Sequence, residues 1–417
     1  MFCRWIKNIM ESIKKPSDIQ PRNMLLVYMP WYLMERELQL GDYVISPFYL
    51  SGHKNLTFFQ GMEDVTKAIT VNHLERPYTS NDRQEFPIKH CSIVRKNGEA
   101  YGYQFSQGEQ DEITILQYIV ALSGISNREF LQQNLYLCSE NFKVFFQKFT
   151  HPFAPPFTPA ITTKRKDGSK GTAFSDGLFR EIKPWHIASQ ALAPNKNYRL
   201  HFDEGLAKCL WTIYKTPANV QIWENHIYPS VFSFYLGNTD GLSHQVEVIY
   251  SVSAIEKLLL GTKFYLHELV TEFQNLITAS GLIIIFPNAT TRNWTSLSYK
   301  NRSNVVTSAS NIFEAWLIES KHVRNNFAHG NAVNRSSLIW TVDEHLLISS
   351  FVYPLLLKIF IKSKNLCNGC GFSISTEDEN KFKAIGKILE INDLFEQWDG
   401  VNDTHWDKII KDSRWDM

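Results

Sequence analysis

The sequence predicts an α+β protein in which a mostly β N-terminal part precedes an all-α bundle. Aromatic and aliphatic runs punctuated by proline and glycine, as expected of strands, fall within about the first 110 residues. From residue 202 onward, apolar residues recur at helical spacing through a series of long segments. A stretch rich in proline and basic residues separates the two regions.

The N-terminal part is expected to begin with strands and to end with helices. Strands are expected at residues 24–34, 43–50, 91–94 and 100–105. The last two flank Asn97 and Gly98, a dipeptide that favours a two-residue hairpin turn. Near Asp111 the apolar spacing becomes helical, and helices are expected at residues 112–122 and 127–149.

A break follows. Residues 151–159 hold four prolines, and the next stretch carries Lys164, Arg165 and Lys166 among glycine, serine and threonine. This is the clearest linker or exposed loop in the chain. Its basic cluster could contact a phosphate backbone. Such clusters are more often only solvated loops, and both readings stay open here.

The C-terminal half is expected to be helical. Helices are expected at residues 202–214, 220–235, 243–260, 264–280, 305–329, 342–362 and 377–389. The run 282–286 fits either a short strand or a connection between helices. We therefore divide the chain into a β-rich part (1–155), a basic linker (156–200), a helical bundle (201–362) and a polar helical tail (363–417).

Composition narrows the class of protein. The 417 residues include 43 basic and 42 acidic side chains, so the chain is no polycation and any nucleic-acid contact must be local. Six scattered cysteines do not suggest a disulfide framework. The apolar runs at 282–286 and 351–361 are too short to cross a bilayer, and no secretory signal is evident. We expect a cytoplasmic protein without a membrane partner.

The most informative segment runs from Arg324 to Gly330 and reads Arg-Asn-Asn-Phe-Ala-His-Gly. Arginine can hold a phosphate with a fork of donors, and histidine can transfer a proton near neutral pH. These two functions suffice to cut RNA without a metal, because the ribose 2′-hydroxyl is itself the nucleophile. The segment therefore suggests Arg324 and His329 as catalytic residues.

A structural alternative must be weighed against this. Gly330 suits the left-handed position after a helix, and a histidine in the last turn can cap free carbonyls. The spacing is also loose, since Arg83 with His90 and Arg180 with His186 match it too. Prolines lie inside both of those matches and disfavour a continuous helix there. Only the segment at Arg324 lies in an uninterrupted helical pattern.

Together with an upstream segment, these residues resemble a known family. Residues 254–259 read Ala-Ile-Glu-Lys-Leu-Leu, and about seventy residues later comes the segment from Arg324 to Gly330. The pair resembles the HEPN superfamily, in particular its Apea-like branch found in bacterial abortive-infection proteins. That branch shows an Ala-x-Glu-x-Leu-Leu pattern followed by Arg-Asn-x-x-Ala-His-Gly. The resemblance covers about residues 200–362, while the first 150 residues fit no family.

The resemblance implies an activity and an assembly. Many HEPN domains are metal-independent endoribonucleases, built as bundles of four or five helices that act as dimers with one composite site. Carried over, Arg324 would stabilise the phosphoryl oxygens and His329 would act as general base or acid. Asn325 would orient the phosphate or the histidine. The spacing agrees with a dimer, because positions five apart on a straight helix point about 140° away from each other.

Other residues are weaker candidates. Glu256 could be catalytic or could pair with Arg324, although such a glutamate is more often structural. Asn326 and His322 flank the motif and are more often surface residues, and we keep Asn326 with Lys164, Arg165 and Lys166 as candidate RNA contacts. Cys367 and Cys370 have the spacing of half a zinc site, but the chain has no second pair and a turn explains them equally well. No metal or cofactor is expected.

The hypothesis is a HEPN-type endoribonuclease acting in phage defence or as a toxin. Its partners would be an RNA substrate and a second copy of the chain. The N-terminal part would recruit RNA or sense a phage-derived or nucleotide trigger. One alternative is a non-catalytic HEPN-fold module that binds RNA or protein. Another is a helical interaction module with no role in RNA chemistry, which the near-zero net charge permits.

Overall fold

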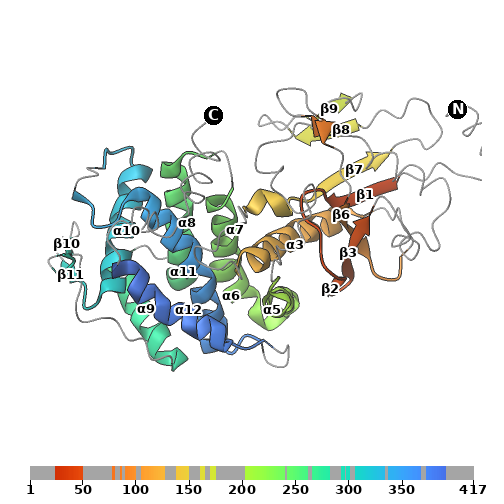
Figure 1. Ribbon diagram of the computed structural model, residues 1–417. Helices are drawn as coiled ribbons and strands as arrows, with labels where there is room; N and C mark the ends of the chain where they lie inside the picture. The colour runs from red at the N-terminus through yellow and green to blue at the C-terminus, as the bar shows by residue number, and fades with distance from the viewer. Residues whose placement is uncertain are drawn as a thin grey trace, which may run out of the picture.

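The computed structural model confirms the α+β class, with an antiparallel sheet of five strands followed by a mostly helical region (Figure 1). It describes residues 24–49, 78–79, 85–86, 90–99, 105–126, 138–149, 160–164, 170–174, 202–239, 242–261, 265–281, 293–295, 297–300, 306–333, 337–367 and 372–390.

The five-stranded sheet has the order β2-β3-β6-β1-β7. Its strands are β1 (Met24–Met29), β2 (Leu38–Leu40), β3 (Tyr43–Tyr49), β6 (His90–Lys96) and β7 (Phe145–Phe149). Val27, Val94 and Ile45 lie opposite one another across β1, β6 and β3. Because alternate residues of a strand share a face, this buried row marks the face that meets the helices.

Two of the expected strands are found with shorter limits, and the one expected at 91–94 is found as the longer β6. The first one ends at Met29 because a turn begins at Pro30, whose ring cannot donate to a ladder. The expected turn at Asn97 and Gly98 is present, with the amide of Glu99 donating to Lys96 at 3.3 Å and Gly98 at φ +77°. β6 pairs with β1 and β3, and residues 100–104 lie outside the described part.

Three further strand pairs are short. They are β4 (Tyr78–Thr79) with β5 (Glu85–Phe86), β8 (Ala160–Lys164) with β9 (Lys170–Phe174), and β10 (Ser298–Lys300) with β11 (Val306–Ser308). β8 and β9 lie within the segment expected to be a linker. Lys164 is opposite Lys170 at the end of this pair, while Arg165 and Lys166 lie outside the described residues.

The predictions of two helices, at residues 127–149 and 305–329, are wrong in part. Within 127–149, Ser139–Phe142 is a 3₁₀ turn (η3) and Phe145–Phe149 is the edge strand β7, which pairs with β1. Aromatic residues favour strands, and pairing with the distant strand β1 stabilises this segment as a strand instead of a helix. The helix expected at 305–329 begins only at Ile312, because Val306–Ser308 pairs as β11 and Asn311 caps the helix with its side chain.

The remaining expected helices are confirmed within a few residues. They are α3 (Gln107–Ser126), α5 (Glu204–Lys215), α6 (Val220–Ile222) continuing through η5 (Trp223–Ile227) into α7 (Tyr228–Gly237), α8 (His244–Leu260), α9 (Leu266–Ser280), α11 (Val342–Ser363) and α12 (Thr376–Glu390). The shortened helix that begins at Ile312 is α10 (Ile312–Ala328). The run 282–286 lies outside the described residues.

Helix α8 lies at the centre of the bundle. It packs against α7, α9, α10 and α11, and Figure 1 shows these helices gathered around it. Val252, Ala254, Ile255 and Leu258 of α8 are all fully or almost fully buried. A helix surrounded in this way must be apolar over most of its circumference, which explains the wide apolar stripe seen in its sequence.

The sheet and the bundle share one hydrophobic core. Helix α3 lies between them (Figure 1), and Gln117 on it donates to the hydroxyl of Tyr235 on α7 at 3.0 Å. The ring of Tyr43 on β3 meets that of Trp211 on α5 edge-on, with centroids 5.7 Å apart. Helix α12 joins the same core through Phe382, Ile385 and Leu389.

Helix α11 is long and apolar enough to cross a membrane, and it alone is so among the described helices. However, 78% of its 18-residue apolar window is buried inside the fold, as in the core helix of a soluble protein. Lys358 on this helix is 3% exposed and pairs with Asp203 and Asp378, each at 2.7 Å.

Lys358 connects the starts of two other helices. Asp203 caps α5 by accepting from the amide of Leu206, and Asp378 accepts from Ser375 ahead of α12. Burial by itself would raise the pKa of Asp378, but the charge of Lys358 and the hydrogen bonds from Ser375 hold it below its usual 3.8. The carboxylate is therefore ionised and paired at neutral pH.

We predict that Lys358→Met lowers the free energy of unfolding by about 3–5 kcal/mol in urea titrations at pH 7, because it leaves buried carboxylates unpaired. Lys362→Met, one turn later on the exposed side of α11, should change it by less than about 0.5 kcal/mol. The effect should shrink as the pH falls through the lowered pKa of Asp378, since a protonated carboxyl needs no counter-charge. Equal effects of the two substitutions would contradict this role.

Candidate active site

The segment from Arg324 to Gly330 forms the C-terminal end of α10. The amide of Gly330 donates to Phe327 O at 3.1 Å, and the amide of Asn331 donates to Asn326 O at 2.9 Å. Gly330 has φ +69°, a left-handed conformation that glycine adopts without strain. These features define a Schellman motif, so the helix-stop reading of Gly330 is confirmed as local structure.

His329 lies at the very end of the helix. It is the C-cap residue of α10, with φ −95° and ψ 6°, and its amide still donates to Asn325 O at 3.1 Å. Its side chain is exposed and makes no hydrogen bond to the described residues. The imidazole is therefore available to solvent, to a ligand or to a second subunit.

Arg324 lies on the last turns of α10 and is held by α8. Its Nε and Nη2 donate to Ser253 Oγ at 3.3 and 3.4 Å, and Nη1 donates to Asn325 Oδ1 at 3.0 Å. Nη2 lies 3.5 Å from the carboxylate of Glu256. The side chain keeps 22% of its surface exposed, and its longer contacts are weak enough to be exchanged for those of an anion.

Glu256 is the buried acid of this cluster, with 1% of its side chain exposed. It pairs closely with Lys321, one turn before Arg324 on α10, as well as with Arg324 itself. The structure thus places Glu256 against Arg324, in line with the pairing considered from the sequence. A carboxylate buried this deeply orients other groups and has little surface left for contact with a substrate.

Lys257 adds a further cation beside Arg324. Its Nζ donates to Ser233 Oγ on α7 at 3.0 Å. Burial, and then the charge of Arg324, lowers the pKa of Lys257, against the opposing effect of Glu256. Burial also lowers the pKa of Lys321. Three cationic side chains therefore surround one carboxylate, and the cluster carries net positive charge suited to an anion.

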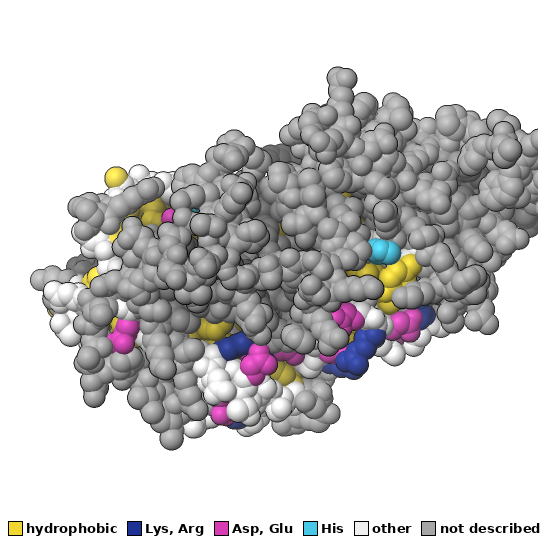
Figure 2. All heavy atoms as spheres, viewed as in Figure 1, with side chains coloured by type: hydrophobic (Ala, Val, Ile, Leu, Met, Phe, Trp, Pro, Cys, Tyr) yellow, Lys and Arg dark blue, Asp and Glu magenta, His cyan; other side chains and the backbone are white. Residues whose placement is uncertain are grey.

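The positive charge is local. On the face shown in Figure 2, described basic side chains lie next to acidic ones along the lower edge of the molecule, as the near-zero net charge suggests. The excess of cations around Glu256 therefore results from the packing of α7, α8 and α10 and not from the overall composition.

Sequence reasoning missed Ser233, Ser253, Lys257 and Lys321. Ser253 lies three residues before Glu256, and helical spacing already places both on one face of α8. Lys257 directly follows Glu256 and points about 100° around the helix from it, so spacing gave no signal for it. Lys321, like Ser253, could have been found from its spacing, in this case to Arg324. Ser233 could not, because only tertiary packing brings α7 to this point.

Some candidates do not meet in this chain. No hydrogen bond or ion pair joins Arg324 to His329 within the described residues. The side-chain amide of Asn326 contacts His322 at 3.0 Å on the exposed side of α10. Of the three basic candidates of the expected linker, Lys164 lies at the end of β8, which packs against β7 and β9, while Arg165 and Lys166 lie outside the described residues.

The described cysteines differ in their bonding state. Cys367 is disulfide-bonded, while the buried Cys91, Cys138 and Cys209 form no disulfide. Among the described residues, no group of three or more His, Cys, Asp or Glu side chains could hold a metal ion. A bonded Cys367 supplies no thiolate, so its sulfur is not available as a zinc ligand.

Comparison with known proteins finds no match to a family model, a curated protein or a solved structure. The site is therefore defined by its own geometry: a buried carboxylate, a net positive cluster above it, and an exposed imidazole at the adjoining helix end.

We predict that Glu256→Gln destabilises the protein by about 3–5 kcal/mol in urea titrations, because Lys321 then stays buried without a counter-charge. Glu224→Gln, which removes an exposed carboxylate on η5, should cost less than about 0.5 kcal/mol. Replacing both Glu256 and Lys321 by leucine should recover part of the loss, since no buried charge is left unpaired. A double variant less stable than Glu256→Gln would argue against the pairing.

Proposed function

We propose that this protein is a metal-independent endoribonuclease of HEPN type, acting in phage defence or as a toxin. One observation carries the proposal: a half-buried arginine in a net positive cluster lies next to a helix end that exposes a histidine. The helical region resembles a HEPN bundle in its two motifs, and α8 and α10, which carry them, pack against each other.

The chemistry needs few groups. Attack of the ribose 2′-oxygen on phosphorus forms a bond while the bond to the 5′-oxygen breaks, which leaves a 2′,3′-cyclic phosphate and a 5′-hydroxyl. His329 would take the proton from the 2′-hydroxyl or return one to the leaving oxygen. Arg324 would bind the phosphoryl oxygens, which carry the growing negative charge. Asn325 would hold the guanidinium in position through its contact with Nη1.

A second copy of the chain would complete the site. One imidazole cannot serve as base and acid in the same step, and Arg324 and His329 of one chain make no direct contact among the described residues. Two chains related by a two-fold axis would supply two histidines and two arginines around one phosphate. The exposed end of α10 is the part of the bundle that would lie at this axis.

The alternative function is a non-catalytic HEPN-fold module, and a specific observation favours it. The contacts of Arg324 with Ser253 and Glu256 tie α10 to α8, which by itself is a structural reason for an arginine at this position. On that view the N-terminal sheet and the bundle would form a binding protein. Cleavage assays separate the two functions.

We predict that the purified protein cleaves RNA in excess chelator and leaves cyclic phosphate ends. His329→Ala should lower the rate by about 10²–10⁴-fold, the usual contribution of a general acid or base. Arg324→Ala should lower it by a similar factor, because charge on the phosphoryl oxygens is then unopposed. The readout is single-turnover cleavage of a labelled RNA.

The matched control is His322→Ala, which removes an exposed imidazole two turns earlier on the same helix. Its rate should stay within about twofold of the parent, since it leaves the end of α10 intact. Equal cleavage by the parent and both site variants would assign the activity to a contaminant or another site. Tight RNA binding without cleavage, with phage lysate supplied as a source of trigger, would support the non-catalytic alternative.

We also predict that the site is shared between two subunits. Dimers containing one Arg324→Ala chain and one His329→Ala chain, co-expressed with different tags and purified through both, should cleave RNA faster than either homodimer. The reason is that each subunit supplies the group that the other lacks. No recovery in a verified heterodimer would contradict the composite site without contradicting cleavage itself.

A further inference from the structure

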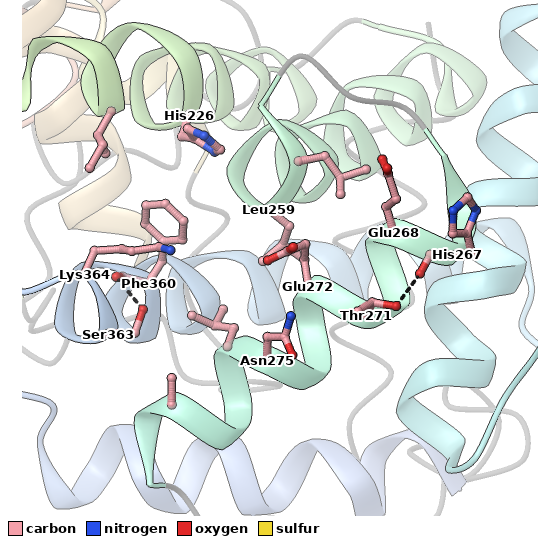
Figure 3. A pocket seen from close by; sticks show the side chains of 14 residues that line it. His226, Leu259, His267, Glu268, Thr271, Glu272, Asn275, Phe360, Ser363 and Lys364 are labelled. Atoms are coloured by element: carbon pink, nitrogen blue, oxygen red, sulfur yellow. Dashed lines mark hydrogen bonds between the residues drawn. The ribbon is translucent and has the colours of Figure 1, made fainter.

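A separate pocket lies at the C-terminal end of α8, about one turn beyond Glu256. It has a volume of about 700 Å³, is open to solvent on one side, and is lined by η5, the last turn of α8, α9 and the C-terminal end of α11 (Figure 3). Leu259, Leu260 and Phe360 provide apolar surface, and its size falls in the range of small-molecule sites. The pocket contains none of the residues proposed for RNA cleavage.

The chain builds one wall of this pocket through an irregular helix. Trp223–Ile227 forms a π-helical turn, and Pro229 follows it. Proline lacks an N–H, and its ring displaces the carbonyl four residues earlier, which accounts for the widened turn. His226 lies in this turn, and Gly261 packs so closely on it that a Cβ would come within 2.9 Å of the imidazole. The position of His226 is thus fixed by its surroundings.

His226 presents an acceptor. Its Nδ1 lies 2.9 Å from the carbonyl of Leu258, so Nδ1 carries the proton that is donated there. In the neutral ring, Nε2 is left with a lone pair. The ring is stacked on Phe360, with centroids 5.7 Å apart, at the edge of the apolar surface.

Two carboxylates face the same space from α9. Glu268 and Glu272 are four residues apart and therefore share a face of the helix, and Figure 3 shows Glu272 pointing into the space between α9 and α11. The Oε2 atom of Glu268 is buried and makes no hydrogen bond to the described residues. Burying a carboxylate oxygen without a hydrogen-bond donor costs free energy, so a ligand that donates to this atom would be stabilised there.

The charges around the pocket favour a cation. Lys364 is the one Lys or Arg among the lining residues, where His267 adds an imidazole, and its Nζ lies 5.9 Å from the centre of the Phe360 ring. Against this one ammonium are the two carboxylates, with Nε2 of His226 as a further acceptor. The carboxylates therefore outnumber the ammonium, and the acceptors lie on separate walls with aliphatic surface between them.

We propose that this pocket binds a small aliphatic polyamine. One ammonium would take the position between Glu268 and Glu272, supplying the donor that Glu268 lacks. The alkyl chain would cover Leu259 and Phe360, and a second amine would donate toward Nε2 of His226. This binding is independent of the proposed RNA cleavage, because the two sites share no residue.

The test uses three ligands of equal length in calorimetric titrations of the full chain at low salt: 1,6-diaminohexane, 1,6-hexanediol and adipate. We expect the diamine to bind and the neutral and anionic ligands to bind at least about tenfold more weakly, since only the diamine pairs with the carboxylates. Glu268→Gln and Glu272→Gln should each lower the affinity for the diamine by about 10-fold or more. Glu99→Gln removes an exposed carboxylate after the turn that follows β6 and should leave the affinity for the diamine unchanged.

A steric variant locates the binding. Ala279→Trp places a large side chain at an exposed lining position and should abolish diamine binding without lowering the melting temperature. If Glu268→Gln does not fold, the affinity of the Glu272→Gln variant, at an exposed position, provides the test instead. The proposal is overturned if the diamine does not bind, if hexanediol or adipate binds as tightly, or if these variants of folded protein leave the diamine affinity unchanged.

Discussion

The buried carboxylate of Glu256 is the constraint on which the bundle and its site depend. A charge removed from water must be paired, and on the central helix α8 the pairing comes from Lys321 and Arg324 of α10. This requirement fixes the rotation and the height of α10 against α8. It thereby also fixes where in the bundle the end of α10 lies, and with it the position of His329. The same interaction supports the fold and positions the candidate catalytic groups.

A second buried charge acts in the same way at another point of the fold. Lys358 on α11 pairs with the acids at the starts of α5 and α12, so one ammonium group fixes the relative positions of three helices. The apolar contacts around it are less selective, because close-packed aliphatic side chains tolerate small shifts better than a buried ion pair does. The apolar core extends from the bundle into the sheet. Together the two charge clusters explain why the helices around this core pack in one defined arrangement.

Both candidate sites occur where a helix departs from regular geometry. At the end of α10, the left-handed Gly330 stops the helix and exposes His329. At η5, the wide turn before Pro229 brings His226 to the edge of a pocket. In a regular helix the backbone is fully paired and the side chains follow a fixed spacing, so irregular turns are where unusual side-chain positions become available.

The sequence by itself determined most helices of the bundle, the end of α10 and the candidate catalytic residues there. Helical spacing and a glycine stop are local properties, and they are read from a few neighbouring side chains. The tertiary structure decided the rest. Phe145–Phe149 became a strand because β1 offers a free edge, and Val306–Ser308 because β10 lies beside it. The hydrogen bond between Lys257 and Ser233 likewise depends on the packing of α8 against α7. The sequence does not reveal such pairs, because partners distant in sequence produce no periodic pattern.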